Sequence, residues 1–175
     1  MMKLIPIEQI DIPTIKHFKE SFNQTQNIIH GANQLQRSKN INQWLRDVAI
    51  LKTKDYKQSV QTTHYALINH LGEMVGISDV KHHLTPYLQK EGGHISYSIS
   101  PAYQGKGYGT LLLKETLKKA HMLELKKVLL TCKETNIASK KVIENNQGIY
   151  QYTIVINQSK VEHYLIHLDN NNYIM

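Results

Sequence analysis

The sequence predicts an α/β fold in a single domain that spans residues 1–175. A chain of 175 residues fits one domain with a proper core. Its composition, 41% hydrophobic and 20% charged, is typical of a globular protein. Strand and helix periodicities alternate in the order β, α, α, β, β, β, α, β, α, β, β, which indicates a mixed sheet of about seven strands flanked by about four helices.

The N-terminal third is predicted to hold one strand and two helices. Residues 3–7 (KLIPI) form a short apolar run that is typical of a strand. Asp11 followed by Pro13 indicates a helix start, with aspartate as the N-cap and proline in the first turn. A second helix is predicted over residues 41–54, where we expect Trp44 to pack against the sheet rather than to serve as a substrate platform.

The middle of the chain is predicted to form three strands and a loop. Residues 62–70 and 73–83 look like two strands joined by a tight turn. Residues 84–93 carry a proline and a pair of glycines, so a loop is predicted there. Residues 94–100 alternate between apolar and polar side chains, and the apolar face of this strand consists of Ile95, Tyr97 and Ile99.

The C-terminal part is predicted to continue as helix, strand, helix and hairpin. Residues 108–121 have helical periodicity, and residues 127–133 (KVLLTCK) are typical of a buried strand. Asn136 is expected to cap a short helix that runs to Asn145. The two strands of the hairpin and a ragged tail complete the chain, at residues 148–157, 160–168 and 169–175.

Several protein classes are disfavoured by composition. The N-terminus (MMKLIPIEQIDIPTIKHF) lacks the apolar segment of a signal peptide, and no window approaches the roughly 20 apolar residues of a membrane span. We therefore expect a cytoplasmic location and no membrane partner. The single cysteine, Cys132, cannot form an internal disulfide, which agrees with a reducing compartment.

The net charge of +7 raises the question of an acidic partner. Residues 101–141 hold nine lysines and three glutamates, 9 − 3 = +6, so an anionic ligand would be drawn to this part of the chain. Solvation of two exposed helix faces is an equally good explanation for Lys118, Lys119, Lys126 and Lys127. Nucleic-acid binding is disfavoured because no zinc-finger spacing, recognition helix or aromatic-interleaved basic run accompanies the charge.

The stretch QGKGYG, residues 104–109, concentrates glycines at the start of a predicted helix. Unblocked N–H groups at a helix N-terminus can bind an anion through geometry and dipole. The P-loop pattern is excluded because no lysine follows the last glycine. The dinucleotide fingerprint is excluded because its third glycine position, counted from Gly105, holds Thr110. Glycines that serve only a tight turn or a helix cap are the alternative.

Gln104, Gly107 and Gly109 fit the pattern Arg/Gln-x-x-Gly-x-Gly/Ala, through which the chain resembles the GNAT superfamily of acyl-CoA-dependent N-acetyltransferases. The preceding ISYSISP looks like the family's fourth strand, VLLTC looks like its fifth, and NIAS resembles the opening of its next helix. The resemblance covers residues 93–152 and is greatest to a bacterial subgroup of predicted acetyltransferases. It implies a GNAT-like fold in which the fourth and fifth strands splay apart.

The resemblance implies acetyl-CoA as the acyl donor and as a substrate, with no metal. In the family, pantetheine inserts beside the fourth strand, and a strand N–H stabilises the oxyanion, by about 3 kcal/mol in comparable sites. Gly107 and Gly109 are expected to be glycine because a side chain there would hold the phosphates away. The implied cofactor-binding residues are Ser98, Ile99 and Ser100 for pantetheine, Gln104, Gly105, Lys106, Gly107, Tyr108, Gly109 and Thr110 for the pyrophosphate, and Asn136 and Ser139 on the next helix.

Acyl transfer requires a deprotonated amine, so a positioned general base or a water chain is expected. The family resemblance implies that such a base lies near the start of the fourth strand. His94 is the leading candidate because its ordinary pKa of about 6.5 suits this work, and Glu91 is the alternative. Many family members place a tyrosine seven residues after the asparagine as the acid for the leaving thiolate, but here that position is Ile143. Tyr150 and Tyr152 are possible substitutes, or the thiolate leaves without an acid.

Other reactive side chains are expected to be structural. Cys132 lies within a buried strand and is interpreted as a core thiol rather than an acyl-enzyme nucleophile. His82 and His83 would point to opposite faces of a strand, while His163 and His167 share a face but lack a third ligand, so no metal site is predicted.

The acceptor is the least specified part of the prediction. It would be bounded by residues 28–40, residues 84–93 and the final hairpin, which offer few acids beyond Glu91 and Glu162. A small amine, an amino acid or a peptide N-terminus is therefore favoured over a polycation. The alternative function is a catalytically silent acyl-CoA-binding or nucleic-acid-associated module. A homodimer is expected by analogy with the family.

Overall fold

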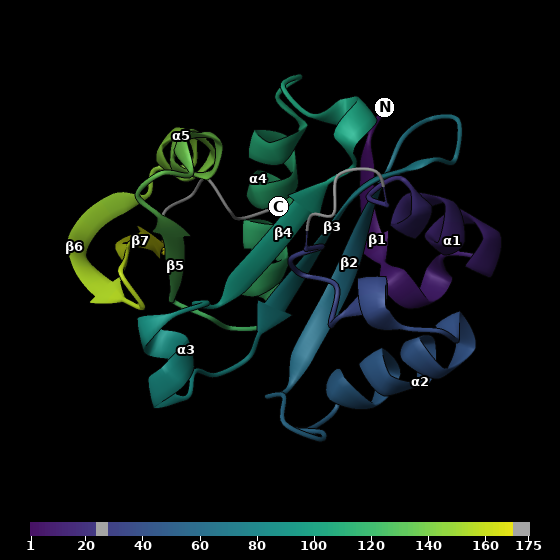
Figure 1. The fold of residues 1–175 in the computed structure, drawn as a ribbon, viewed down its shortest axis with the longest axis horizontal. Coiled ribbons are helices and arrows are strands. Elements are labelled where there is room, and N and C mark those ends of the chain that lie inside the picture. Colours follow the sequence, from purple (N-terminus) through teal and green to yellow (C-terminus); the bar gives the residue numbers. More distant parts are fainter. Residues whose placement is uncertain (24–27, 170–175) are drawn as a thin grey trace.

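A computed structural model of the protein describes residues 1–23 and 28–169 and divides their seven strands between two sheets (Figure 1). The first sheet has the order β1-β2-β3-β4 and the second has the order β5-β7-β6. All neighbours within each sheet are antiparallel. The strands are β1 (Lys3–Pro6), β2 (Thr62–Ile68), β3 (Met74–Lys81), β4 (Ile95–Ile99), β5 (Lys127–Lys133), β6 (Ile149–Ile156) and β7 (Ser159–His167).

Helices cover both faces of the first sheet. The α-helices are α1 (Ile12–Glu20), α2 (Ile41–Leu51), α3 (Pro86–Lys90), α4 (Tyr108–Met122) and α5 (Ile137–Asn145). Figure 1 shows α1 and α2 together on one side of the first sheet and α4 on the other. A core with Phe18 and Ile77 lies under α1 and α2, whereas Val80 and Leu117 belong to the core under α4. Each strand of this sheet therefore presents one face to each helix layer.

The predicted α/β fold is confirmed, and most elements begin or end within two residues of their expected limits. The predicted caps are also confirmed, because Asp11 Oδ1 accepts from the Thr14 N–H (2.8 Å) and Asn136 Oδ1 accepts from the Ser139 N–H (3.1 Å). Trp44 is buried and its Nε1–H donates to the Ala32 carbonyl (2.9 Å), as expected of a packing residue.

The expectation of one mixed sheet is corrected, because among the described residues no ladder joins β4 to β5 and all paired strands within the two sheets are antiparallel. Two elements also differ from the prediction. The region predicted as a loop at residues 84–93 contains the five-residue helix α3, because Thr85 caps it through the Leu88 N–H (3.2 Å) and Pro86 suits its first turn. Helix α2 ends at Leu51 rather than near residue 54.

Two further predictions concern the C-terminal tail and membrane-spanning helices. The predicted ragged tail lies outside the described residues except for Asp169. Across residues 1–23 and 28–169, no helix is long and apolar enough to cross a membrane.

Candidate active site

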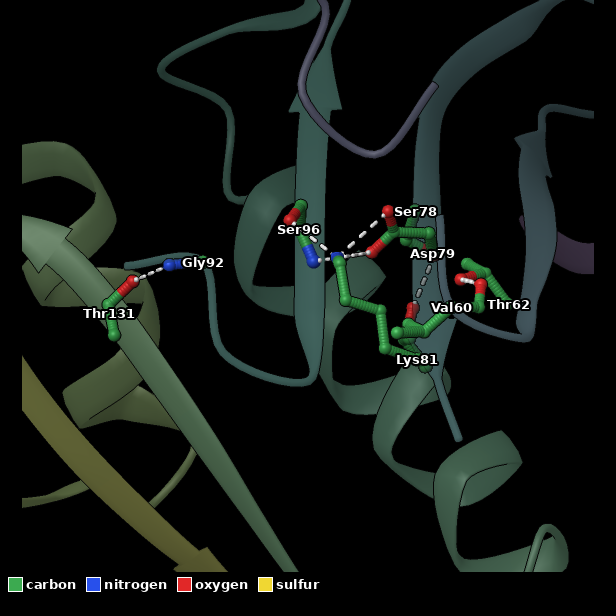
Figure 2. Close-up of polar contacts among 9 residues, drawn as sticks. Val60, Thr62, Ser78, Asp79, Lys81, Gly92, Ser96 and Thr131 are labelled. Carbon is green, nitrogen blue, oxygen red and sulfur yellow. Dashed lines mark hydrogen bonds and ion pairs between the residues drawn. The ribbon is translucent and has the colours of Figure 1, made fainter. Parts of the chain in front are cut away.

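The two sheets meet where β4 begins, and hydrogen bonds join them there. The His94 N–H donates to the Leu129 carbonyl in the middle of β5 (2.8 Å). The Gly92 N–H donates to Thr131 Oγ1 on the same strand (3.0 Å; Figure 2). The strand ladders of each sheet join only strands of that sheet. β4 is an edge strand of the first sheet and β5 is an edge strand of the second. These two strands are in contact at the junction and diverge beyond it. This is the splayed pair of strands that the sequence predicted.

Gly93 makes this junction possible. Its φ of +63° is a conformation that favours glycine, and an added Cβ would lie 2.4 Å from the Leu129 carbonyl oxygen. The glycine pair in the sequence thus brings the backbone before β4 directly against β5.

His94 is engaged at the same junction through its side chain. Its Nδ1 accepts a hydrogen bond from the Leu129 N–H (2.9 Å), so the ring proton of the neutral imidazole must lie on Nε2. Burial, followed by the positive charge of Lys81, lowers the pKa of His94 to about 4. At neutral pH the ring is uncharged and its lone pair is already shared. The structure therefore gives no support to the predicted role of His94 as general base, and assigns it to the β4–β5 junction.

Glu91, the alternative base, ends α3. Its carboxylate lies 3.4 Å from the Tyr87 hydroxyl, and its N–H donates to the Tyr87 carbonyl (2.8 Å). Both contacts are local, and they hold the side chain beside α3 rather than over β4.

The edge of β4 beyond the junction carries the backbone groups that could pair with pantetheine. The Ser100 N–H donates to the Val75 carbonyl on β3 (2.9 Å), and the His94 carbonyl accepts from Lys81 (2.8 Å). Because backbone groups alternate along a strand, those of Ser98 and Ser100 face β3 and those of Tyr97 and Ile99 face the open edge. Of the three predicted pantetheine partners, Ile99 is therefore the one whose backbone groups lie on the open edge.

The Ile99 carbonyl has a side-chain partner. Gln104 Nε2 donates to it (3.0 Å), so the glutamine of the glycine motif folds back onto the open edge of β4. A ligand that pairs with this carbonyl shares it with the glutamine side chain or displaces that side chain.

The glycine loop follows a short 3-10 turn, Pro101–Tyr103, and leads into α4. Gly105 and Gly107 have φ values of +73° and +82°, and an added Cβ at either would meet no atom of the described chain within 4 Å. The first residues of α4, Tyr108 to Thr110, have N–H groups without an intrahelical acceptor by helix geometry. The loop thus presents backbone donors to an open surface, as a pyrophosphate requires.

Tyr103 fixes this loop to the β2–β3 turn. Its hydroxyl donates to Glu73 Oε2 (2.5 Å), which also accepts from Asn69 Nδ2 (2.6 Å). Its ring contacts both the Lys106 ammonium (5.6 Å from the ring centre) and the Tyr108 ring (5.9 Å between centres). Lys106 also donates to the Ala102 carbonyl (2.8 Å), so the loop lysine lies along the turn.

Gly109 has a different role from the predicted one. An added Cβ would lie 3.1 Å from Val142 Cγ2 on α5, and not in the open space before the helix. Asn146 Nδ2 donates to the Thr110 carbonyl (3.1 Å) nearby. Gly109 and Thr110 therefore belong to the contact between α4 and α5, and the expectation that Gly109 clears space for phosphate is corrected.

The start of α5 faces β4 through one hydrogen bond that the sequence did not reveal. Ser139 Oγ lies 3.0 Å from the Tyr97 hydroxyl, and burial raises the pKa of Tyr97 to about 12. Asn136 caps the helix with its oxygen, which leaves its amide N–H₂ as a donor for a ligand. Tyr97 was predicted only as an apolar-face residue, because its reach to α5 depends on tertiary structure.

The predicted acid candidates lie away from this opening. Tyr150 and Tyr152 are on β6, and β7 separates that strand from β5, so roughly 10 Å of sheet intervenes at about 4.8 Å per strand. The Tyr150 hydroxyl pairs with Thr153 (2.9 Å), and Tyr152 stacks on His163. Ile143 is buried in the core under α4 and α5. The structure does not bring a tyrosine from β6 to the β4–β5 opening.

The remaining candidates have structural surroundings. Cys132 is buried, and burial, followed by the nearby Glu162, raises the pKa of its thiol to about 11, which agrees with a core thiol. Glu162 is itself buried and paired with Lys140 (3.1 Å) and Tyr164 (2.6 Å). In residues 1–23 and 28–169, no three histidine, cysteine, aspartate or glutamate side chains are grouped to hold a metal ion.

A charged pair on β3 borders β4 on the side of α1 and α2. Lys81 Nζ donates to both oxygens of Asp79 (2.9 and 3.1 Å) and lies 3.1 Å from Ser96 Oγ (Figure 2). Asp79 Oδ1 also accepts from the Ser96 N–H (2.8 Å). Gly31 packs against the same place, since an added Cβ would lie 2.4 Å from the Ser96 carbonyl oxygen. This pair was not predicted from the sequence. Its only sequence signal is that Asp79 and Lys81, two residues apart in the stretch SDVK, carry opposite charges.

The strand opening and the glycine loop define the class of the protein. The chain belongs to the GNAT acetyltransferase family, because the family model for the acetyltransferase (GNAT) domain matches residues 2–147. This confirms the family resemblance. No curated protein matches the chain significantly.

Solved structures agree on the fold. Spermidine N-acetyltransferase from Vibrio cholerae in complex with CoA and spermine has a TM-score of 0.69 at 14% identity, covering 99% of this chain and 98% of that one. The yncA protein from Salmonella typhimurium with its cofactor acetyl-CoA has a TM-score of 0.65 at 14% identity, with coverages of 97% and 95%. A dodecameric structure of the Vibrio cholerae enzyme has a TM-score of 0.66 at 14% identity, with coverages of 95% and 94%.

Proposed function

We propose that this protein transfers the acetyl group of acetyl-CoA to a primary amine of a small molecule, amino acid or peptide, by direct transfer in a ternary complex. The observation that carries this proposal is the opening between β4 and β5 directly beside the glycine loop. A chain with this opening can hold the pyrophosphate and the thioester of one acyl-CoA molecule at the same time.

The donor would be bound in three places. N–H groups from Gly105 to Thr110 hold the pyrophosphate, with Lys106 adding positive charge. The edge groups of Ile99 pair with a pantetheine amide after Gln104 moves aside. The side-chain amide of Asn136 donates to the pantetheine arm from the opposite wall. The two structural neighbours with CoA or acetyl-CoA support this donor.

The reaction forms one bond and breaks one. The amine nitrogen attacks the thioester carbonyl carbon, the C–S bond breaks, and CoA leaves as a thiolate. The edge N–H groups of Tyr97 and Ile99 are the candidate donors to the oxyanion. The proton that the nitrogen loses passes to water, and the thiolate needs no acid because a thiol of pKa about 8.5 is a good leaving group.

Thiol release with a panel of amines, combined with thermal unfolding in the presence of CoA, tests this function. We expect CoA to raise the Tm and at least one primary amine to give stoichiometric thiol release with acetyl-CoA. Stabilisation by CoA without turnover would instead favour the silent acyl-CoA-binding module, and salt-sensitive retention on DNA would favour the nucleic-acid-associated one. The cytoplasmic location, the absence of a metal and the homodimer stay predictions.

A further inference from the structure

A cavity of about 230 Å³ lies on the α1 and α2 side of the first sheet, beside the β4–β5 junction. The end of α2, the entry to β2, the end of β3 and α3 form its walls, and Asn33 from the segment between α1 and α2 completes them. Two of the regions expected to bound the acceptor, residues 28–40 and residues 84–93, therefore contribute to it. The volume is below the range of about 300–1,000 Å³ that is common for drug-sized ligands, so a small ligand fits.

The inner wall of the cavity connects to β4 through the charged pair already described. Asp79 and Lys81 line the cavity, and both make hydrogen bonds to Ser96, two residues after the point where His94 joins β5. The cavity wall on β3 is thus linked through Ser96 to the strand whose open edge would hold the thioester.

The charges of this wall cancel. Asp79 contributes one negative charge and Lys81 one positive charge, and they neutralise each other in a buried salt bridge with side-chain exposures of 9% and 13%. The third titratable group, His64, is neutral at pH 7, because burial lowers its pKa to about 4. No excess negative charge is therefore available to a polycation among the described lining residues.

His64 supplies an unused hydrogen-bonding group. It lies opposite Asp79 in the β2–β3 ladder, lines the cavity and is 3% exposed. Its Nδ1 has no hydrogen-bond partner in the part of the chain that the structure describes. Buried polar groups in proteins are nearly always paired, so an unpaired imidazole beside a cavity points to a ligand with donors or acceptors of its own.

The rest of the cavity wall combines neutral polar side chains with the apolar side chains of Leu51, Val60 and Leu88. The polar ones are hydroxyls and amides, which can each bind neutral hydroxyl or amide groups, namely Asn33, Gln58, Ser59, Thr62, Thr85 and Tyr87. Such a lining suits a small ligand with uncharged polar groups and some apolar carbon surface.

We propose that this cavity is the acceptor site and that it takes a small primary monoamine whose other substituents are neutral hydrogen-bonding groups, either hydroxyls or amides. This inference rests on the proposed acetyltransferase function and names its substrate class. The amine would lie at the inner wall beside the Asp79–Lys81 pair, and the neutral groups would contact His64 and the other polar side chains of the lining. A polyamine is disfavoured because its further ammonium groups would find no free carboxylate in the described lining.

The test compares four amines with acetyl-CoA by thiol release. Glucosamine carries hydroxyls, serinamide carries an amide and one hydroxyl, hexylamine carries no polar group beyond the amine, and spermine is a polycation. We expect kcat/KM for glucosamine or serinamide to exceed that for both hexylamine and spermine by at least tenfold. A faster reaction with glucosamine shows that hydroxyls suffice, and a preference for spermine or hexylamine would overturn the proposal while leaving the acetyltransferase function intact.

Variants locate the site. Ser59→Trp fills the cavity without removing a buried polar group, and it is expected to raise the KM for the preferred amine at least tenfold with the CoA-dependent rise in Tm unchanged. Asp79→Asn is expected to do the same, and Glu20→Gln, an exposed carboxylate on α1, serves as the matched control with unchanged kinetics. An unchanged KM in Ser59→Trp would overturn the assignment of the cavity even if Asp79→Asn fails to fold.

Calorimetric titration of serinamide and of glucosamine into the protein saturated with CoA separates this proposal from the proposed function. Binding of either amine that is lost in Ser59→Trp supports the cavity even without turnover, in which case the acetyltransferase function fails alone. If neither amine binds to the wild-type protein, the proposal for the cavity is wrong.

Discussion

His94 and Leu129 share two hydrogen bonds: the His94 N–H donates to the Leu129 carbonyl, and the Leu129 N–H donates to His94 Nδ1. One residue of β5 is thus held by both the backbone and the side chain of the residue that precedes β4. The contact fixes the point from which the two strands diverge. The contact also gives the His94 side chain, which the sequence indicated as a catalytic base, a structural role at the junction of β4 and β5.

Replacement of His94 tests this assignment. His94→Ala leaves the partly buried Leu129 N–H without its acceptor, and we expect a loss of about 1–3 kcal/mol in the free energy of unfolding by urea. The pH dependence of kcat/KM between pH 6 and 9 should keep its shape, because the ring does not titrate in that range. His94→Asn, whose side-chain oxygen can replace Nδ1 as the acceptor, should recover part of the stability. Loss of an ionisation from the rate profile of a folded variant would restore His94 as the base.

The pH dependence of stability follows from two buried histidines. Burial lowers the pKa of both His64 and His94 to about 4, whereas an unfolded histidine titrates near 6.5. Between these pH values the unfolded chain binds protons that the folded chain does not. The contribution of the two neutral histidines to the free energy of unfolding is therefore fully present above pH 6.5 and is lost as the pH falls towards 4. Urea unfolding at pH 4.5, 5.5, 6.5 and 7.5 measures it. We expect His94→Asn to reduce the slope, and an equal slope in wild type and variant would contradict the cited pKa.

The glycine loop is tested by a pair of matched glycines. Gly107 and Gly72 both have φ near +82° and open surroundings in the described chain, but Gly72 lies in the β2–β3 turn. Valine at either position imposes similar backbone strain, of order 1–2 kcal/mol. Only Gly107→Val should abolish the CoA-dependent rise in Tm, because its side chain would occupy the space for the pyrophosphate. An equal CoA effect in both variants would argue against the loop as the phosphate site.

Gly93 is expected to be the least replaceable glycine at the junction. In Gly93→Ala the new methyl group would lie 2.4 Å from a backbone oxygen of Leu129, which cannot move without displacing β5. At Gly92 the nearest atom to an added Cβ is the flexible Leu88 side chain at 3.0 Å. Differential scanning calorimetry should therefore show a larger fall in Tm for Gly93→Ala than for Gly92→Ala. A similar or smaller fall would mean that β5 is not held against Gly93.

Tyr103 offers a test of loop positioning that does not touch the reacting atoms. Tyr103→Phe removes the hydrogen bond to Glu73 and keeps the ring that contacts Lys106 and Tyr108. We expect the Kd for CoA to rise severalfold with kcat nearly unchanged. A hydrogen bond to a charged group contributes about 1.5–3 kcal/mol, and only part of this free energy would affect CoA binding at the loop. A fall in kcat with an unchanged Kd would assign Tyr103 to another role.

Local signals predicted most helices and strands, whereas the donor half of the site was implied by the family resemblance and stays a prediction. Asp11 and Asn136 cap their helices as their residue types and positions indicate. The alternation in residues 94–100 gave the correct faces of β4. Thr85 and Pro86 are typical of a helix start, with an N-cap threonine and a proline in the first turn. The loop was predicted at residues 84–93 because greater weight was given to the proline and the pair of glycines.

The residues of the proposed acceptor site are brought together by the register between strands. Asp79 lies opposite His64 on one side and Ser96 on the other, and these positions are separated by 15 and 17 residues in the sequence. A single sequence does not reveal which strand residues become neighbours. For the same reason it could not show that the lone pair of His94 is taken by Leu129, or that Tyr97 reaches α5.

The hydrogen bond from Gln104 to the Ile99 carbonyl has a consequence for the protein without its donor. An unpaired strand edge is a template for pairing with another chain and hence for aggregation. In the proposed mode of donor binding, β4 keeps such an edge open for pantetheine, and without the donor Gln104 occupies the Ile99 carbonyl on that edge. The Gln104 side chain, which begins the glycine motif, therefore opposes pairing of this strand edge with another copy of the protein when the donor is not bound. This reduces the tendency of an enzyme with an open sheet edge to aggregate at high concentration.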